Sequence, residues 1–475
     1  MSEKPSTALR IARNGTALFA IAAVLAGCGL AEYTAPSTDL PAEFSAPAPE
    51  RDATRGMQWW AAFNDSELNG LISAGLQRNL DVAQAIEAVN EARGNARLAG
   101  ASDLPSASVS GTYYRGDPDA TGFVTSGSYA DLDVSWMIDL FGQNRNSRAA
   151  AEAQLDAAYL SIDVARLTMM SAIASAYIDA RYYQETIELT RQSISSRRES
   201  LGLTETKVEY GSAPRLELVQ AQQLVAQAEA QLPALEVGFD QSINRLATLT
   251  NQSVSSLKSR LQKGAPQPRP RYSASVGIPA EAIRNRPDIQ AAERQYAASV
   301  YNVGVAKAAF YPSLSLTGSF TPVNVNGRGS YKTWSFGPTL SLPIFSGENN
   351  ANLTIAESQA VQARLGYQAT VLGAVEEVES ALAAYNRDSR NISAQRRLVD
   401  AAQETVTLSR TSFDIGDTEF FTVLDAEREL LDARNSLSQA VRQQAQNFVT
   451  LSVATAGAGI GPRPATAATA TAAPQ

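Results

Sequence analysis

The sequence predicts a mixed α/β membrane protein made mainly of long coiled-coil helices, with four β-strands per chain. Three observations predict this fold class. Two long stretches carry a helical apolar period and are almost free of Gly and Pro. Four shorter segments alternate apolar and polar side chains. The chain also matches itself at an offset of about 205 residues, so we expect a duplicated half-molecule.

Composition excludes several classes of function. The chain has 475 residues, no His and one Cys, with 40 Lys+Arg against 48 Asp+Glu. Without His there is no Ser-His-Asp triad and no His metal ligand, and one Cys cannot build an internal disulfide or a Cys-based zinc site. The acidic pI of about 5.0 argues against nucleic acid as a partner. The mean hydropathy of −0.17 is that of a soluble protein, which is expected if lipid-facing residues are confined to four alternating strands.

The N-terminus reads as an export signal over residues 1–27, with a basic start and an apolar stretch too short to span a bilayer. It ends in Leu25-Ala26-Gly27-Cys28, which resembles a bacterial lipobox, so we predict a covalent lipid on Cys28. The alternative is an ordinary signal peptide with an incidental Cys. Residues 28–63 are then a lipid-anchored linker rich in Pro, Ala, Ser and Thr, and residues 458–475 form a disordered tail.

The internal match divides the rest of the chain. Leu104-Pro105-Ser106 aligns with Tyr311-Pro312-Ser313, and Gly211 aligns with Gly416. We therefore expect a first repeat over 64–260, a linker over 261–280 and a second repeat over 281–457. Functional parts should come in pairs.

Each repeat is predicted to contain two strands, at about 104–115 and 129–141 in the first and about 312–322 and 332–345 in the second. One face is apolar, whereas the other is small and polar and carries Asp131, Asp133 and Asp139. The alternative is a half-buried strand of a soluble sandwich, but carboxylates suit water better than a dry core. Four strands cannot close a barrel, and an open edge in lipid leaves backbone groups unpaired, so the barrel must be shared between chains.

Long helices are predicted to follow the strands, at about 144–250 and about 348–452, each reversing at a glycine turn. Apolar residues at heptad spacing, many of them Ala, indicate coiled-coil packing. A helix of this kind is about 100 Å long at 1.5 Å per residue, which suits a structure that spans a compartment. Shorter helices are expected at about 66–100 and 281–310.

These features resemble the TolC-like outer-membrane factors, specifically the NodT-type lipoproteins of resistance-nodulation-division efflux pumps. The resemblance rests on the lipobox at Cys28, on Trp59-Trp60-Ala61-Ala62-Phe63, on Arg286-Pro287-Asp288-Ile289 and on Asp425-Ala426-Glu427-Arg428. It implies a homotrimer with a shared 12-stranded barrel in the outer membrane and a helical barrel in the periplasm. It implies a periplasmic adaptor and an inner-membrane pump as partners. It implies passive conduction of substrates to the exterior, without catalytic residues, metal, or any cofactor beyond the lipid on Cys28.

The resemblance also implies a periplasmic gate formed by Phe421, Asp425 and Arg428. Their spacing places them on one helix face, and a symmetric ring of Asp at a constriction favours cations. The alternative is an ordinary surface ion pair. The first repeat has Gln220 where the second has Asp425, so only one repeat would carry the ring. The adaptor contacts expected under this resemblance are the turns, at Gly211, Ser212, Gly416 and Asp417.

Two other functions fit parts of the pattern. One is the outer-membrane conduit of a type I protein secretion system. The other is a structural coiled-coil surface lipoprotein, against which the four alternating strands argue. An enzyme is rejected, because no nucleophile–base pair, metal cluster or phosphate loop is present in the sequence.

Overall fold

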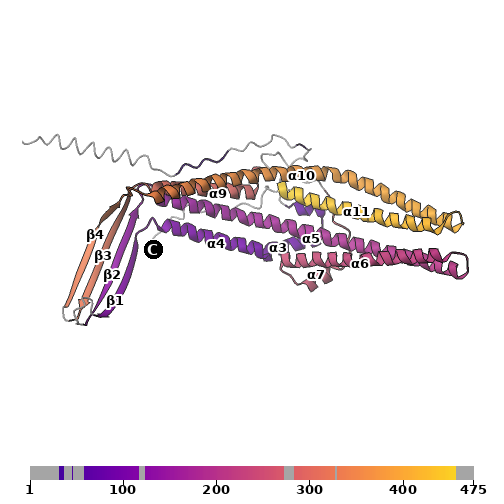
Figure 1. Ribbon diagram of the computed structural model, residues 1–475, viewed down its shortest axis with the longest axis horizontal. Coiled ribbons are helices and arrows are strands. Elements are labelled where there is room, and N and C mark those ends of the chain that lie inside the picture. Colours follow the sequence, from indigo (N-terminus) through magenta and orange to yellow (C-terminus); the bar gives the residue numbers. More distant parts are fainter. Residues whose placement is uncertain are drawn as a thin grey trace, which may run out of the picture. The chain divides into compact units, whose positions relative to one another are not determined.

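A computed structural model describes residues 31–36, 45, 58–116, 124–271, 283–326 and 329–455. The chain divides into two compact units, and each unit takes segments from both repeats. The first unit comprises Met1–Ser37, Glu87–Leu160 and Gln290–Ala369, and the second comprises Thr38–Ile86, Ser161–Ile289 and Thr370–Gln475. Several helices begin in one unit and end in the other. The fold class predicted from the sequence, long helices with four strands in a duplicated chain, is confirmed (Figure 1).

The order of elements repeats along the chain. Short helices precede a pair of strands, which precede a pair of long helices. The bounds in chain order are η1 (Trp59–Phe63), α3 (Ser66–Arg78), α4 (Leu80–Ala101), β1 (Ser106–Gly116), β2 (Thr125–Ile138), α5 (Gln143–Glu209), α6 (Arg215–Thr250), α7 (Val254–Leu261), α9 (Pro287–Ala308), β3 (Ser313–Val325), β4 (Gly329–Ser341), α10 (Gly347–Asp414) and α11 (Phe420–Thr455).

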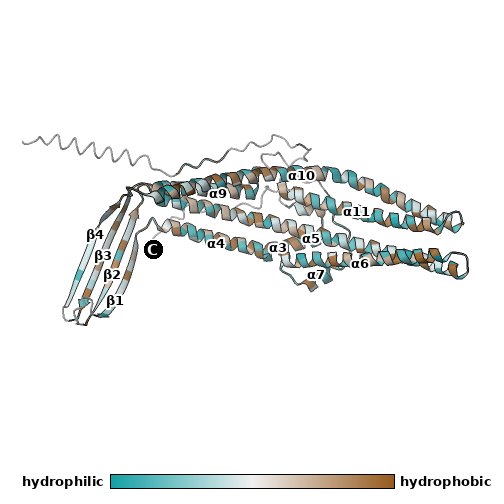
Figure 2. Ribbon diagram, in the orientation of Figure 1, coloured by the Kyte–Doolittle hydropathy of each residue, from teal (hydrophilic) through white to brown (hydrophobic). Residues whose placement is uncertain are grey.

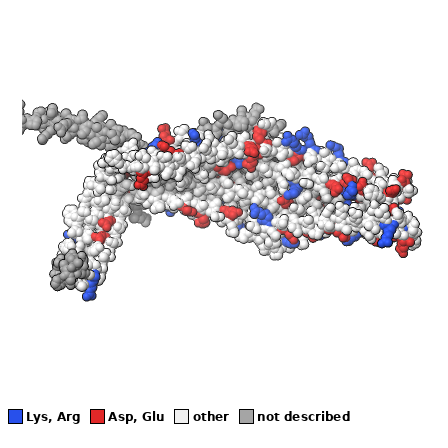
Figure 3. Space-filling model, viewed as in Figure 1, with Lys and Arg blue, Asp and Glu red and all other residues white. Residues whose placement is uncertain are grey.

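The first unit contains one antiparallel sheet with strand order β1-β2-β3-β4. The strands are 11 to 14 residues long, and strands of about 9 to 11 tilted residues suffice to cross a bilayer. Figure 2 shows brown and pale residues alternating along them, and Figure 3 shows few charged side chains over the sheet compared with the helices. β1 and β4 each have one neighbour within the described sheet, so each presents an unpaired edge.

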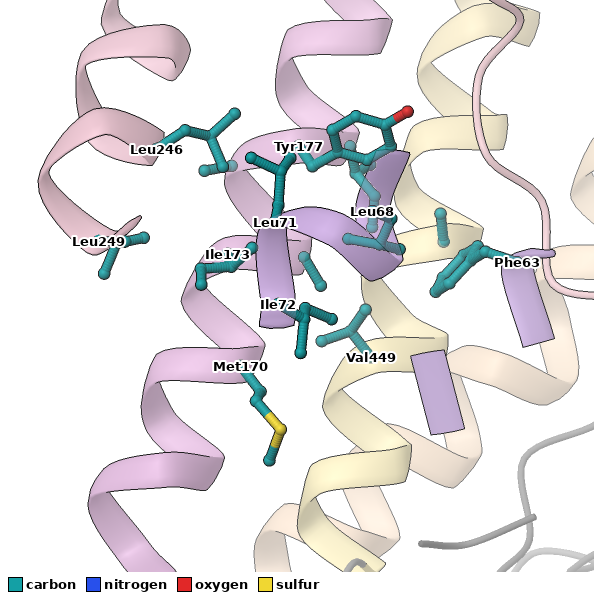
Figure 4. Close-up of a cluster of buried hydrophobic side chains, with 14 of the residues drawn as sticks. Phe63, Leu68, Leu71, Ile72, Met170, Ile173, Tyr177, Leu246, Leu249 and Val449 are labelled. Carbon is teal, nitrogen blue, oxygen red and sulfur yellow. The ribbon is translucent and has the colours of Figure 1, made fainter. Parts of the chain in front are cut away.

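The second unit is held by a core where short helices pack on the long ones. Trp59, Phe63, Leu68, Leu71 and Ile72 contribute from η1 and α3, and they meet side chains from α5, α6 and α11 (Figure 4). The ring of Phe63 lies edge-on to Phe448, with centroids 5.3 Å apart. The Trp-rich motif noted in the sequence is therefore part of this core.

Among the helices that the structure describes, one, α5, contains a stretch long and apolar enough to cross a membrane by length and composition. Core helices pass the same test, and Ile173, Ala174 and Tyr177 of α5 are fully buried in the core just described.

Candidate functional site

The two faces of the sheet carry different side chains: residues that lie opposite one another across the four strands are apolar on one face and polar on the other. Val109 lies opposite Leu132, Leu132 opposite Phe320, and Phe320 opposite Trp334. Trp334 is 77% exposed in the single chain. An exposed apolar surface of this kind requires a cover, and period-two alternation is the pattern of a strand that faces lipid on one side. The apolar residues on this face include Ala107, Val109, Tyr113, Leu132, Val134, Trp136, Leu314, Leu316, Phe320, Trp334, Phe336 and Leu340.

Basic residues on this apolar face lie near the strand ends. Arg115 is next to the end of β1, and Lys332 is near the start of β4. Both positions flank the β1–β2 and β3–β4 connections. Long basic side chains at such ends reach lipid headgroups while their stems stay in the apolar layer.

The opposite face is built of hydroxyls and carboxylates. The next row pairs Ser108 with Asp133, Asp133 with Ser319, and Ser319 with Ser335. The two serine hydroxyls of Ser319 and Ser335 are 2.8 Å apart. The Thr321 hydroxyl donates to Asp131 Oδ1 at 2.6 Å. In the described sheet, Asp131 and Asp133 are the charged residues of this face, which is therefore suited to water.

The two helical hairpins of the second unit turn in the same way. Gly211 has φ +70° and Gly416 has φ +79°, a region that costs an L-residue with a side chain. The Gly211 N–H donates to the Val208 carbonyl, and the Ser212 N–H donates to the Lys207 carbonyl. The second turn repeats both bonds, from Gly416 to Phe413 and from Asp417 to Ser412. Both helices thus end in a Schellman motif, and both tips lie at the same end of this unit (Figure 1).

Phe421, Asp425 and Arg428 share one exposed face of the first turns of α11. Arg428 Nη2 lies 2.6 Å from Asp425 Oδ1, and both side chains are nearly half exposed. Phe421 is 54% exposed, whereas its neighbour Phe420 is buried. The three residues are therefore brought together, with the aromatic ring nearest the turn.

A polar cluster that the sequence reasoning missed lies on the opposite face of α11. Glu427 is 7% exposed, and its carboxylate lies 2.6 Å from Arg410 Nη2. The same Arg410 nitrogen donates to Ser196 Oγ of α5 at 2.8 Å. A cavity of about 220 Å³ beside this cluster is lined by residues that include Ser193, Ser196, Arg410, Glu427 and Arg434.

Arg197 lies buried near the same cluster. Its Nη1 donates to the Leu224 carbonyl at 2.9 Å. Burial lowers the pKa of this guanidinium, and the charge of Glu427 opposes that shift. A sequence signal for the cluster existed, because Glu427 falls in the apolar stripe of Val423, Leu424 and Leu430.

Aromatic contacts join the two hairpins at the tips. Lys207 Nζ of α5 lies 3.7 Å from the ring centroid of Phe413 of α10. Phe413 in turn contacts Phe420 of α11, with centroids 5.2 Å apart. These helices therefore share a small packed cluster that includes Phe420, the neighbour of the exposed Phe421.

Cys28 lies outside the described residues, but the segment that follows it is held on the first unit. The Ala31 N–H donates to Asn146 Oδ1 at 2.8 Å, and the Tyr33 hydroxyl donates to Glu293 Oε1 at 3.0 Å. Burial first, and then the Glu293 carboxylate, raise the pKa of the Tyr33 hydroxyl. A Cβ on Gly304 would come within 2.5 Å of Asn146 Oδ1, so this segment fits closely.

Among the described residues no group of three or more acidic, His or Cys side chains could hold a metal ion.

A sheet with one apolar and one hydroxylic face, together with long paired helices, defines a membrane channel component. The comparisons with known proteins agree. The model of the outer membrane efflux protein family matches residues 71–252 and 278–457. Nodulation protein T of Rhizobium leguminosarum bv. trifolii is 39% identical over 458 residues, covering 94% of this chain and 97% of its own length.

Two further similarities extend this result. Outer membrane protein OprJ of Pseudomonas aeruginosa is 30% identical and covers 87% of this chain and 89% of its own length. The solved open state of the Neisseria gonorrhoeae MtrE outer membrane channel has a TM-score of 0.81 at 27% identity, covering 91% of this chain and 98% of that chain. The chain belongs to the outer membrane efflux protein family. It is an outer-membrane efflux channel that extends into the periplasm, and it is a transport protein rather than an enzyme.

Proposed function

We propose that three copies of this chain form the exit channel of a tripartite efflux pump, with a periplasmic adaptor and an inner-membrane pump as partners. The observation that carries the proposal is the open four-stranded sheet with one apolar face. Unpaired backbone groups at the edges of β1 and β4 would each cost several kcal/mol in lipid, so the edges must pair with other chains. Three chains give twelve strands, as the family resemblance implies, and the face of Asp131 and Asp133 then lines the lumen.

The periplasmic gate is part of this proposal. Three copies of the exposed pair Asp425–Arg428 would surround one axis, with Phe421 one turn nearer the tip. Like charges in such a ring repel unless each is paired, so the Arg428 contacts hold the narrow state. Opening follows when the Asp425–Arg428 contacts break.

Conductance in planar bilayers tests the gate. The double variant Asp425→Ala/Arg428→Ala is expected to raise the single-channel conductance several-fold over the native channel, because the charged ring and its partners are gone. The matched control is Gln220→Ala/Gln223→Ala, at the corresponding positions of the first repeat, which should leave the conductance unchanged. An unchanged conductance in the Asp425→Ala/Arg428→Ala variant contradicts the gate.

The lipid on Cys28 and the adaptor contacts are further parts of the proposal. Cys28 is three positions before Ala31 in the sequence, a reach of about 10 Å at most, so the docked segment at Asn146 would hold the lipid close to the first unit. The native chain is expected to incorporate labelled palmitate, and the Cys28→Ala variant is expected to lose the label. A Cys28→Ala variant that still incorporates the label refutes the anchor.

We assign the adaptor contacts to Gly211, Ser212, Gly416 and Asp417, whose turns are exposed at the hairpin tips.

The alternative of a type I secretion conduit uses the same architecture. The efflux names of the relatives favour the pump, since Pseudomonas putida relatives are named as solvent and toluene efflux pump outer membrane proteins. A strain that lacks the gene separates the two functions. Increased susceptibility to a panel of toxicants supports the efflux pump, whereas loss of secreted proteins from the medium supports the type I secretion conduit.

A further inference from the structure

Two basic side chains on the apolar face of the sheet have no ionic partner among the described residues. Arg115 of β1 and Lys332 of β4 are the basic residues of the four described strands, and both are exposed. Neither forms an ion pair with another residue that the structure describes. The carboxylates of the same strands, Asp131 and Asp133, belong to the opposite face. The partner of these two cations must therefore come from outside the sheet.

Basic residues at the other end of the sheet are neutralised within the chain. Where β2 leads into α5, Arg145 lies 3.3 Å from Asp139, and Arg148 lies 2.9 Å from Glu152. Within the described strands, uncompensated positive charge is therefore confined to the end that carries the β1–β2 and β3–β4 connections.

Each edge strand places its basic residue two positions beyond an exposed aromatic ring. Tyr113 precedes Arg115 in β1, and Trp334 follows Lys332 in β4, so in both strands the basic residue is nearer the connection. Two residues of a strand span about 7 Å. Aromatic rings at the edge of an apolar band mark the border between hydrocarbon and headgroups. Arg115 and Lys332 are thus placed at the level of the headgroups.

The side chains between the two edge strands at this level are hydroxyls and an amide. Tyr113 lies opposite Ser128, Ser128 lies opposite Asn324, and Asn324 lies opposite Ser330. Ser128, Asn324 and Ser330 are all exposed. The sheet therefore presents a cation at each edge with neutral hydrogen-bonding groups between them. We call this set the outer belt: Arg115, Ser128, Asn324, Ser330 and Lys332.

The outer belt lies at the end of the sheet that faces the cell exterior. The long helices follow the opposite ends of β2 and β4, and the chain is an outer-membrane channel that extends into the periplasm. The headgroups at the exterior end are those of the outer leaflet, which in this membrane is built largely of phosphorylated glycolipid. Arg and Lys bind phosphate through charge-assisted hydrogen bonds, and serine and asparagine side chains can both donate to and accept from sugar hydroxyls.

We infer that the outer belt binds the phosphorylated glycolipid headgroup of the outer leaflet, with Arg115 and Lys332 on phosphates and Ser128 and Asn324 on the sugar. The inference rests on the proposed assembly, in which the apolar face is the outer surface of a closed barrel. A glycolipid with two phosphates on a sugar core matches two separated cations with hydroxyls and an amide between them. A glycerophospholipid offers a single phosphate and no sugar core, so it matches the belt less well.

Lipid titrations of the detergent-extracted chain, followed by native mass spectrometry, test the inference. The probes are lipid A with two phosphates, the same lipid A without phosphates, and phosphatidylglycerol. The variant is Arg115→Gln/Lys332→Gln. The matched control is Arg245→Gln/Lys263→Gln, which removes one exposed Arg and one exposed Lys from the second unit.

The double variant should need about thirty-fold more phosphorylated lipid A for half-occupancy than the native chain, because each basic residue near a charged membrane surface contributes about five-fold. The Arg245→Gln/Lys263→Gln control should bind like the native chain. Phosphate-free lipid A should bind the native chain and the double variant equally, which also shows that the double variant is folded. Asn324→Ala should weaken both forms of lipid A alike, because the sugar is common to them.

Two results would overturn the inference while leaving the channel intact. In the first, a three-chain native particle and its double variant bind phosphorylated lipid A equally. In the second, phosphatidylglycerol binds the native particle as tightly as phosphorylated lipid A does. If the native particle holds only a single chain, the three-chain assembly fails, and the outer belt, which depends on a closed barrel, fails with it.

Discussion

At the residue scale, two adjacent phenylalanines at the start of α11 have different roles. Phe420 is 4% exposed and packs with Phe413, Leu424 and Ala221, whereas Phe421 is 54% exposed. One phenylalanine therefore stabilises the tip, and the other is available to the proposed gate. The exposed ion pair of Asp425 and Arg428 adds little to stability, since such pairs contribute about 0–1 kcal/mol. The proposed role of this pair depends on its repetition around an axis.

Truncation of the two phenylalanines distinguishes these roles. Phe420→Ala should lower the free energy of unfolding by about 3 kcal/mol or more, because it opens a cavity behind the tip. Phe421→Ala should change stability little and raise the single-channel conductance. Thermal unfolding by circular dichroism and bilayer recordings on the same two preparations check both results. Equal losses of stability in the two variants would show that Phe421 is a packing residue.

A buried carboxyl on α10 gives a pH-dependent prediction. Asp388 is 7% exposed, and Asn447 Nδ2 donates to its Oδ2 at 3.0 Å. Burial raises the pKa of Asp388 above its ordinary value of 3.8, and the Asn447 hydrogen bond opposes the rise. A raised folded-state pKa means that the stabilising contribution is fully present below the unfolded value and is lost as pH rises through the folded value.

Asp388→Asn should therefore raise the unfolding temperature at pH 7, by a few degrees at most, and this gain should vanish below about pH 4. Asp400→Asn, an exposed site on the same helix, is the matched control and should show no such crossover. Unfolding temperatures measured from about pH 3 to pH 8 decide the question. A loss of stability at neutral pH in Asp388→Asn would mean that the ionised carboxylate is the favoured form.

At the element scale, the hairpins are shaped by glycine and by paired hydrogen bonds. Both turns use the same Schellman bonds, 205 residues apart. Gly202, by contrast, lies within α5, and a Cβ added there would meet no atom within 4 Å, so this position has no requirement for glycine. The two kinds of glycine should respond oppositely to alanine.

Gly211→Ala and Gly416→Ala should each cost about 1–2 kcal/mol locally, because alanine disfavours the left-handed conformation. Gly202→Ala should be neutral or stabilising by up to about 1 kcal/mol. Amide hydrogen exchange at residues 205–220 and 410–425 measures these effects directly. Faster exchange confined to the two turn variants is the expected result, and unchanged protection in both would contradict the need for glycine.

At the scale of the whole molecule, sequence reasoning succeeded where the signal is local and periodic. The alternation around Asp131 and Leu132 predicted which side chains share a face of the sheet, because period two needs no knowledge of partners. The contact between Asp425 and Arg428 could also be predicted, because residues three apart are neighbours on a helix surface.

Long-range contacts could not be found in this way. Ser196 and Arg410 are 214 residues apart, and Tyr33 and Glu293 are 260 apart. No periodic pattern marks either pair, because each depends on how distant helices are brought together.

The central claim is that one chain supplies a third of a closed channel. The mass of the detergent-extracted particle, measured by native mass spectrometry, tests it most directly. The account predicts a particle of three chains, in which every strand edge of the sheet is paired. A particle of a single chain, with its native β signal intact in circular dichroism, would contradict the shared barrel.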